Sequence, residues 1–254
     1  MKKFIINNGT PIALGIIFIF VLWYIFSASI GKGNLVFPSI NETFFEMGNT
    51  LNSKYFYASL GMTLYRTFLG FIISFAIALV LGLFAGSIKF IYKFLIPLMS
   101  VLKSIPTATL VFFIIALSKV KYAPIYIVVL LATPILYEAI SAGIGSTEKE
   151  VLDASKVDGA SYLDILFRIR LPLSLPYIGI GLLSSFALSL KTEIMAEIIS
   201  GNTGDGLGCM ISAVRNTDPG NLAVIFAIAV ICVIIVLVIS ALAYLAKKII
   251  YRFI

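Results

Sequence analysis

Long apolar stretches are the feature of this sequence that most constrains its fold. A run of about 18 or more residues with few charges is a candidate membrane span, because roughly 20 helical residues cross the hydrocarbon of a bilayer. Such runs are Pro11 to Leu35, Thr67 to Ile88, Phe94 to Ser118 interrupted by Lys103, Tyr122 to Tyr137 continuing past Glu138 to Thr147, Leu171 to Leu190, and Pro219 to Ala246. Backbone polar groups in lipid must be satisfied within the segment. We therefore expect an all-α membrane protein with about six transmembrane helices.

Composition agrees with a chain whose solvent is a lipid bilayer. Of the 254 residues, 60% are hydrophobic and 12% are charged, whereas soluble domains carry roughly 25% charged residues. The net charge of +7 comes from basic residues spread along the chain. Nucleic-acid binding needs basic residues clustered on one soluble face, so we expect no nucleic-acid partner.

The positions of Lys and Arg predict the orientation, because cytoplasmic ends of spans carry more of them. With the N-terminus inside, the cytoplasmic side holds Lys2, Lys3, Lys89, Lys93, Lys149, Lys156, Arg168, Arg170, Lys247, Lys248 and Arg252. The outer side then holds fewer, namely Lys32, Lys54, Lys119, Lys121 and Arg215. Both termini are thus predicted to be cytoplasmic. The first run is predicted to be a retained span, with a cleaved signal peptide as the alternative.

Histidine is absent from the chain, and the two cysteines, Cys209 and Cys232, lie far apart in the sequence. These facts exclude a histidine-based metal site or catalytic triad and predict two unpaired thiols. An intramembrane enzyme is therefore disfavoured, and we expect no catalytic residue and no metal site.

A charged segment, "DASKVDGASYLDILFRIRLP", separates the fourth and fifth apolar runs. Thr147 followed by Glu150 is a capping-box pattern that predicts a short helix, which Gly159 would end. A second helix is expected to begin at Ser161 and to lead into the fifth span, with Pro172 in its first turn. This pattern predicts a helical hairpin continuous with a span. The alternative is a solvated loop between two spans.

The spacing of this segment resembles a known motif. Asp153-Ala154-Ser155, three residues, Gly159, nine residues, Ile169, one residue and Leu171-Pro172 is similar to the "EAA" motif, E-A-A-x3-G-x9-I-x-L-P, of membrane subunits of bacterial ABC importers. Asp153 stands for Glu and Ser155 for the second Ala. The resemblance runs from about Ala58 to Arg252 and is nearest to permeases of the nitrate, sulfonate, taurine and bicarbonate group. It is supported by "SLGMTLYRTFLGF", "PLMSVLKSIPTATL" and "AEIISGNTGDGLG".

The resemblance implies a type I transmembrane domain over residues 58–254, preceded by an N-terminal span and extracytoplasmic segment over residues 1–57. The hairpin would be the coupling helix that docks on a separate ATPase. Its coupling residues would be Asp153, Ala154, Ser155, Gly159, Ile169, Leu171 and Pro172. The protein would move a small polar solute, anionic or zwitterionic, into the cell by alternating access.

The resemblance also implies partners and a location. These are ATP-binding cassette ATPase subunits that hold ATP and Mg, a second permease copy that is identical or a close paralogue, and an extracytoplasmic substrate-binding protein, all at the bacterial cytoplasmic membrane. The chain itself has no G-x-x-x-x-G-K-[ST] phosphate loop, so we expect no bound cofactor and no enzymatic activity. The glycine-rich "SGNTGDGLG" lacks the lysine and follows a membrane helix, so it is interpreted as a tight connection near the extracellular gate.

Charged residues inside spans are costly and usually face a cavity or a partner. The candidates for the translocation pathway are Lys191, Glu193, Arg66, Lys103 and Glu138. Arg66 could instead extend to the membrane surface, and Lys191 and Glu193 could belong to an outer interface. Residues two apart on a helix point in different directions, so Lys191 and Glu193 each need another partner. Arg66 is one candidate for Glu193, and the second subunit or the solute could also supply a partner. The rival function is a six-span channel or secondary transporter, in which the hairpin is an ordinary loop.

Overall fold

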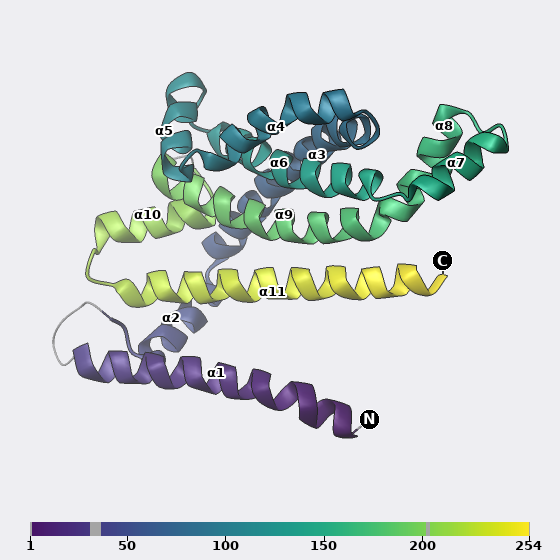
Figure 1. Cartoon of the computed structure of the whole chain (residues 1–254). Coiled ribbons are helices and arrows are strands. Elements are labelled where there is room, and N and C mark those ends of the chain that lie inside the picture. Colours follow the sequence, from purple (N-terminus) through teal and green to yellow (C-terminus); the bar gives the residue numbers. More distant parts are fainter. Residues whose placement is uncertain (1, 31–36, 202–203, 254) are drawn as a thin grey trace. The chain divides into compact units, whose positions relative to one another are not determined.

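The computed structural model describes residues 2–30, 37–201 and 204–253, which form helices with no strand among them (Figure 1). The helices are α1 (Lys2–Ile30), α2 (Ile40–Asn52), α3 (Lys54–Ser87), α4 (Lys89–Ser104), α5 (Thr107–Leu117), α6 (Ala123–Gly145), α7 (Lys149–Val157), α8 (Tyr162–Asp164), η1 (Ile165–Arg170), α9 (Leu171–Ser200), α10 (Leu207–Thr217) and α11 (Leu222–Phe253). The predicted all-α class is confirmed. Lys32, counted above on the outer side, lies outside the described residues.

Several of these helices are long and apolar enough to cross a membrane. Within the described residues there are 4, namely Lys54–Ser87, Ala123–Gly145, Tyr162–Ser200 and Leu222–Ala241, or up to 5 if α4 and α5 together count as one span. In α1 the described apolar stretch, Ala13–Ser29, is shorter than a span. The chain is therefore a multi-pass membrane protein, and the sixth span stays a prediction.

The run from Phe94 to Ser118 is not the single unbroken helix that we expected. It is divided into α4 and α5, which are bent by 97° relative to one another. Proline has no backbone N–H and disfavours the helical conformation of the residue before it. Ile105, which precedes Pro106, accordingly has extended backbone angles, with φ −69° and ψ 126°. The chain turns immediately after α4 for this reason.

The chain clusters into two compact units, one of which comprises residues up to Tyr57 together with Met210–Ile234. In this first unit, Trp23 Nε1 donates a hydrogen bond to the carbonyl of Pro38 at 3.2 Å. The indole ring also lies 6.2 Å from the ring of Phe226, which contacts Phe37 edge to face. This aromatic cluster holds the end of α1 to the segment before α2.

A capping box starts α2. Ser39 Oγ accepts a hydrogen bond from the backbone N–H of Glu42, and the Ser39 N–H donates to the Glu42 carboxylate at 2.9 Å. These hydrogen bonds, the backbone one first, lower the pKa of the Glu42 carboxyl because they favour its charged form. The predicted extracytoplasmic segment therefore contains one short, well-capped helix.

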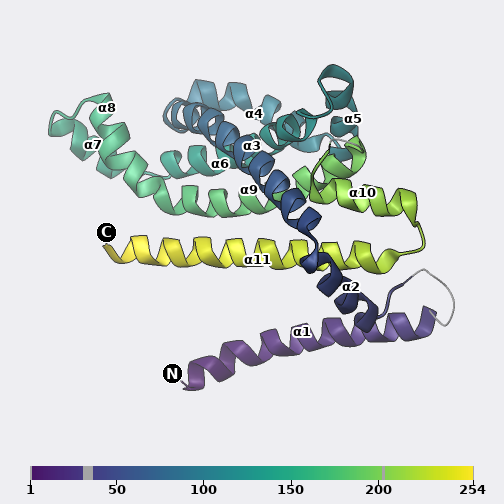
Figure 2. The same ribbon diagram turned by 180° about the vertical axis from the view of Figure 1, so that it is seen from behind.

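The second unit comprises Ala58–Cys209 and Ile235–Ile254. Its core is formed by α3, α4, α6 and α9, which lie together in Figures 1 and 2. Glycines allow the close approach: a Cβ on Gly82 would lie 2.7 Å from Ile140, and one on Gly86 would lie 2.6 Å from Ile144. Small residues at helix contacts are typical of membrane bundles, where packing replaces the hydrophobic effect.

The two glycines of α9 allow a matched test of this packing. A Cβ on Gly181 would overlap the Cβ of Ala139 on α6, whereas one on Gly179 would meet nothing within 4 Å. We expect Gly181→Ala to lower the free energy of unfolding by about 1–3 kcal/mol through overpacking. Gly179→Ala should be neutral or slightly stabilising, because alanine favours helix. Thermal unfolding in detergent measures both, and equal stabilities would contradict the close α6–α9 contact.

Candidate functional site

The helical hairpin predicted from the charged segment is present. α7 ends at Val157, and Gly159 has a φ of +78°, a left-handed conformation that favours glycine. Ser161 caps the next helix by accepting a hydrogen bond from the backbone N–H of Asp164 at 3.2 Å. The start of α7 differs from the prediction, because Thr147 makes no capping box and donates instead to the carbonyl of Ile144.

The second arm of the hairpin continues without a break into α9. The helix α8 passes through the six-residue π-helical turn η1 into Leu171, whose N–H bonds to the carbonyl of Leu166. Pro172 explains the wide turn: it has no N–H for the carbonyl of Arg168, and its ring would clash there in a regular α-helix. The predicted continuity between hairpin and span is confirmed. Pro172, which was predicted to lie in the first turn of the span, is preceded by helix as well as followed by it.

The hairpin also contacts the end of α3. Arg170 Nη1 donates to the carbonyl of Gly86 at 3.5 Å, and a cavity of about 120 Å³ is lined by Ser87 of α3 together with Leu152 of α7 and Tyr162 of α8. The hairpin is thus tied to two spans, α9 by covalent continuity and α3 by contact.

No residue of α7 is buried. Asp153 and Lys156 form an exposed ion pair at 3.0 Å. Val157, at the hairpin tip, is 87% exposed, and Leu163 is also exposed. Among the predicted coupling residues, Ala154, Gly159 and Pro172 are exposed, while Ser155, Ile169 and Leu171 are half-buried. An exposed surface with large apolar side chains beside charges is typical of a protein docking site.

A buried charged cluster lies around Glu197, near the other end of α9. Arg66 of α3 and Glu197 form an ion pair at 2.8 Å, with side chains 3% and 0% exposed. Thr63 Oγ1 also donates to the carboxylate, at 2.8 Å to Oε2. Arg66 further donates to the carbonyl of Asp205 at 3.0 Å. The prediction that Arg66 extends to the membrane surface is therefore wrong.

The same carboxylate caps α10. The backbone N–H of Gly208 donates to Glu197 Oε2 at 2.9 Å, and that of Leu207 donates to Thr63 Oγ1 at 2.9 Å. A negative charge stabilises a helix N-terminus, where backbone N–H groups lack partners within the helix. A Cβ on Gly206 would lie 2.5 Å from the Glu197 carboxylate, so this close approach requires glycine. The described part of the glycine-rich connection thus wraps a carboxylate of the protein itself.

Glu197 was not among the predicted site residues. The sequence feature that could have identified Glu197 is the pair of glycines, Gly206 and Gly208, that follow it after a short connection. Glu193, which was predicted, lies one turn earlier and is fully buried, but neither carboxylate oxygen has a hydrogen-bond partner in the described part of the chain. Arg66 is therefore bonded to Glu197 and not to Glu193, for which it was one candidate partner.

The remaining predicted pathway residues are accessible. Lys103 of α4 and Glu138 of α6 form an ion pair at 2.7 Å, with side chains 44% and 52% exposed. Lys191 is exposed, on the side of α9 away from the buried Glu193. The expectation that Lys191 and Glu193 cannot pair is thus confirmed.

Comparison with known proteins identifies the family. Residues 78–254 match the family model for the binding-protein-dependent transport system inner membrane component. The chain belongs to this family. Its members are permease subunits of ABC importers with the type I fold. Such a permease subunit is not itself an enzyme, and the ATPase is a separate subunit.

Individual relatives agree with the family. The permease is 29% identical to the nitrate import permease protein NrtB of Synechocystis sp. over 76% of this chain and 73% of that protein. It is 24% identical to the glycine betaine/proline betaine transport system permease protein ProW of Escherichia coli, over 93% of this chain and 63% of that protein. A bacterial alginate ABC transporter in complex with an alginate pentasaccharide-bound periplasmic protein has a similar fold, with a TM-score of 0.65, 17% identity and 98% of both chains covered.

The Arg66–Glu197 pair should be important for the stability of the permease. Arg66→Ala leaves a buried carboxylate without its cation, which should cost about 3–5 kcal/mol of unfolding free energy. Lys156→Ala breaks an exposed ion pair and should cost less than about 1 kcal/mol. In a Glu197→Gln background, Arg66→Ala should cost much less than in the wild type. Thermal unfolding of the wild type, of Arg66→Ala, of Glu197→Gln and of the double variant measures this difference, and additive losses would contradict the pairing.

Proposed function

We propose that this permease moves a small polar solute, anionic or zwitterionic, across the bacterial cytoplasmic membrane into the cell by alternating access. The single observation that carries the proposal is the hairpin of α7 and α8, which is helically continuous with α9. Closure of a docked ATPase pair would move the hairpin as a rigid body, and α9 would move with it. The match to the permease family supports the same direction of transport.

The partners follow from the same proposal. Two permease copies, identical or close paralogues, would assemble with two ATPase subunits and receive solute from an extracytoplasmic binding protein. ATP and Mg would bind to the ATPases, and no cofactor to this chain. The exposed apolar side chains of the hairpin, such as Val157 and Leu163, suit a protein cleft better than water.

The solute class is supported by the charges of the spans and by the relatives. Lys191 and Lys103 are exposed cations, and Glu138 is an exposed anion. One relative is named for an anion, nitrate, and another for zwitterions, the betaines. Lys191, Glu193, Arg66, Lys103 and Glu138 remain the proposed pathway residues, with Arg66 acting only through Glu197.

The turn at Gly159 allows a direct test of coupling. Gly159→Ala forces a side chain into a left-handed conformation, whereas Gly159→Asn places there a residue that tolerates it. A Cβ at this position meets nothing within 4 Å, so neither change creates a clash within the chain. We expect solute-stimulated ATP hydrolysis to fall about tenfold in Gly159→Ala, because roughly 1–2 kcal/mol of backbone strain displaces the docking arm, and to be largely retained in Gly159→Asn.

The measurement is ATP hydrolysis by the complex in proteoliposomes, with membrane insertion as the control. Loss in both variants would mean that the cleft excludes any side chain at residue 159. Normal transport by both, or by Gly159→Trp, would contradict the coupling role. Transport by the purified chain in liposomes without an ATPase would instead support the rival channel or secondary transporter.

Lys191 tests the proposed pathway. Lys191→Leu removes an exposed charge from α9, so import should fall by at least about tenfold if the charge attracts the anionic group of the solute. The complex should still assemble and hydrolyse ATP. Lys121→Leu removes an exposed cation from the connection before α6 and is the matched control. Import of the Lys191 variant at the wild-type rate, or its failure to assemble, would make the charge structural.

A further inference from the structure

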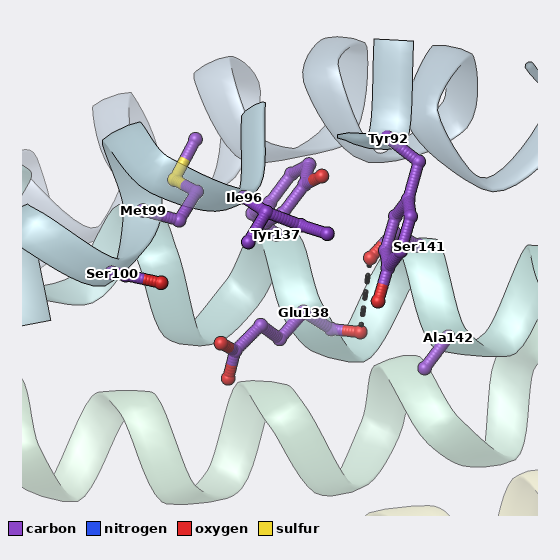
Figure 3. Close-up of a pocket in the computed structure, with 8 residues that line it drawn as sticks. All are labelled: Tyr92, Ile96, Met99, Ser100, Tyr137, Glu138, Ser141 and Ala142. Atoms are coloured by element: carbon purple, nitrogen blue, oxygen red, sulfur yellow. Dashed lines mark hydrogen bonds between the residues drawn. The ribbon is translucent and has the colours of Figure 1, made fainter. Parts of the chain in front are cut away.

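A cavity of about 250 Å³ lies between α4 and α6. Figure 3 shows its wall, in which Tyr92 and Met99 come from α4, and Tyr137, Glu138 and Ser141 come from α6. The volume is just below the roughly 300–1,000 Å³ usual for pockets that hold drug-sized ligands. The cavity therefore suits a smaller solute.

Two tyrosines bring aromatic and hydroxyl groups to this cavity. The ring of Tyr92 extends from α4 toward α6 (Figure 3). Tyr137 is only 2% exposed, and its hydroxyl has no hydrogen-bond partner among the described residues. Buried hydroxyls are normally hydrogen-bonded, so this one is available to a bound molecule or to water.

Glu138 is the charged residue of the cavity wall. Lys103 Nζ, just outside the lining, donates to both of its carboxylate oxygens, at 2.7 and 2.8 Å. Because both side chains are about half exposed, the pair can open without leaving a buried charge. The ammonium group of a solute can then replace Lys103 on Glu138, and an anionic group of the same solute can bind the released Lys103. A simple anion would instead be repelled by Glu138.

We propose that this cavity binds a small zwitterion, with its ammonium group on Glu138 and its anionic group on Lys103. This inference rests on the proposed function, because it names the class of solute that the permease moves. It also narrows that function, since a zwitterion fits the wall and an inorganic anion does not.

The test is direct binding to the full chain assembled with its ATPase partner in lipid nanodiscs, without nucleotide and without the binding protein. The radiolabelled probes are the zwitterions glycine, glycine betaine and taurine. Choline serves as a cation that lacks the anionic group, and nitrate as an anion that lacks the ammonium group. We expect saturable binding of at least one zwitterion, weaker binding of choline, and no competition by nitrate.

Variants locate the site. Glu138→Gln keeps the shape of the wall but removes its charge, and should weaken zwitterion binding by at least about tenfold. Tyr137→Phe removes only the hydroxyl and should weaken binding by a smaller factor. Glu46→Gln neutralises a carboxylate on α2, outside the cavity wall, and should bind like the wild type.

A double variant keeps the proposal testable if Glu138→Gln impairs assembly. Lys103→Glu combined with Glu138→Lys retains an ion pair but places the cation in the cavity wall. Nitrate should then bind, and choline should not.

The proposal is overturned if no zwitterion binds to the wild-type complex, or if nitrate displaces the bound zwitterion. It is also overturned if Glu138→Gln and the double variant bind like the wild type. ATP-driven import by the same complex would leave the proposed function intact in each of these cases. Failure of the chain to assemble with any ATPase would overturn the proposed function itself.

Discussion

The carboxylate of Glu197 holds three helices of this permease together. It lies on α9, is paired with Arg66 of α3, and accepts the N–H of Gly208 at the start of α10. A buried carboxylate is costly unless it is paired and hydrogen-bonded, and here the cation, the Thr63 hydroxyl and the helix N-terminus supply those partners. The geometry works only because glycines let the backbone approach the carboxylate. The end of α9 and the described residues 205–208, which lead into α10, are therefore held together around one side chain.

The opposite end of α9 is helically continuous with the hairpin. The π-helical turn η1 accommodates Pro172 without interrupting the helix, so the hairpin arm and the span form one body. Arg170 adds a contact to the last turn of α3. Because α3 and α9 are also joined through Arg66 and Glu197, a displacement of the hairpin would act on two spans that are already connected at their far ends.

Local sequence patterns predicted local structure well. They failed where contacts with another segment determine the conformation. The Gly159 turn and the Ser161 cap depend on residues within a few positions, and both are present. Thr147 also fits the sequence pattern of a capping residue. However, it follows directly on α6, and its hydroxyl donates a hydrogen bond to the carbonyl of Ile144. The genuine capping box, at Ser39 and Glu42, was not singled out in the sequence, although it uses the same spacing.

The charged cluster around Glu197 shows more clearly that local sequence patterns do not identify partners from distant segments. Glu193 and Glu197 are one helical turn apart on α9, so both lie on the same face and both could meet a cation from α3. Only the packing of α3 and α10 against α9 selects Glu197 for Arg66. Those partners are far away in sequence, and no periodicity within α9 identifies them.

The ion pairs of the spans therefore differ in how much free energy their separation costs. Arg66 and Glu197 are enclosed and fully bonded, so separating them would leave buried charges, at a cost of several kcal/mol. Lys103 and Glu138 are paired but half exposed, so their separation costs little once each meets an opposite charge. A charge that must respond to a passing solute has to be of the second kind. Of the charges proposed for the pathway, Lys103, Glu138 and Lys191 are therefore the exposed ones, whereas Arg66 is enclosed with Glu197 and Glu193 is buried.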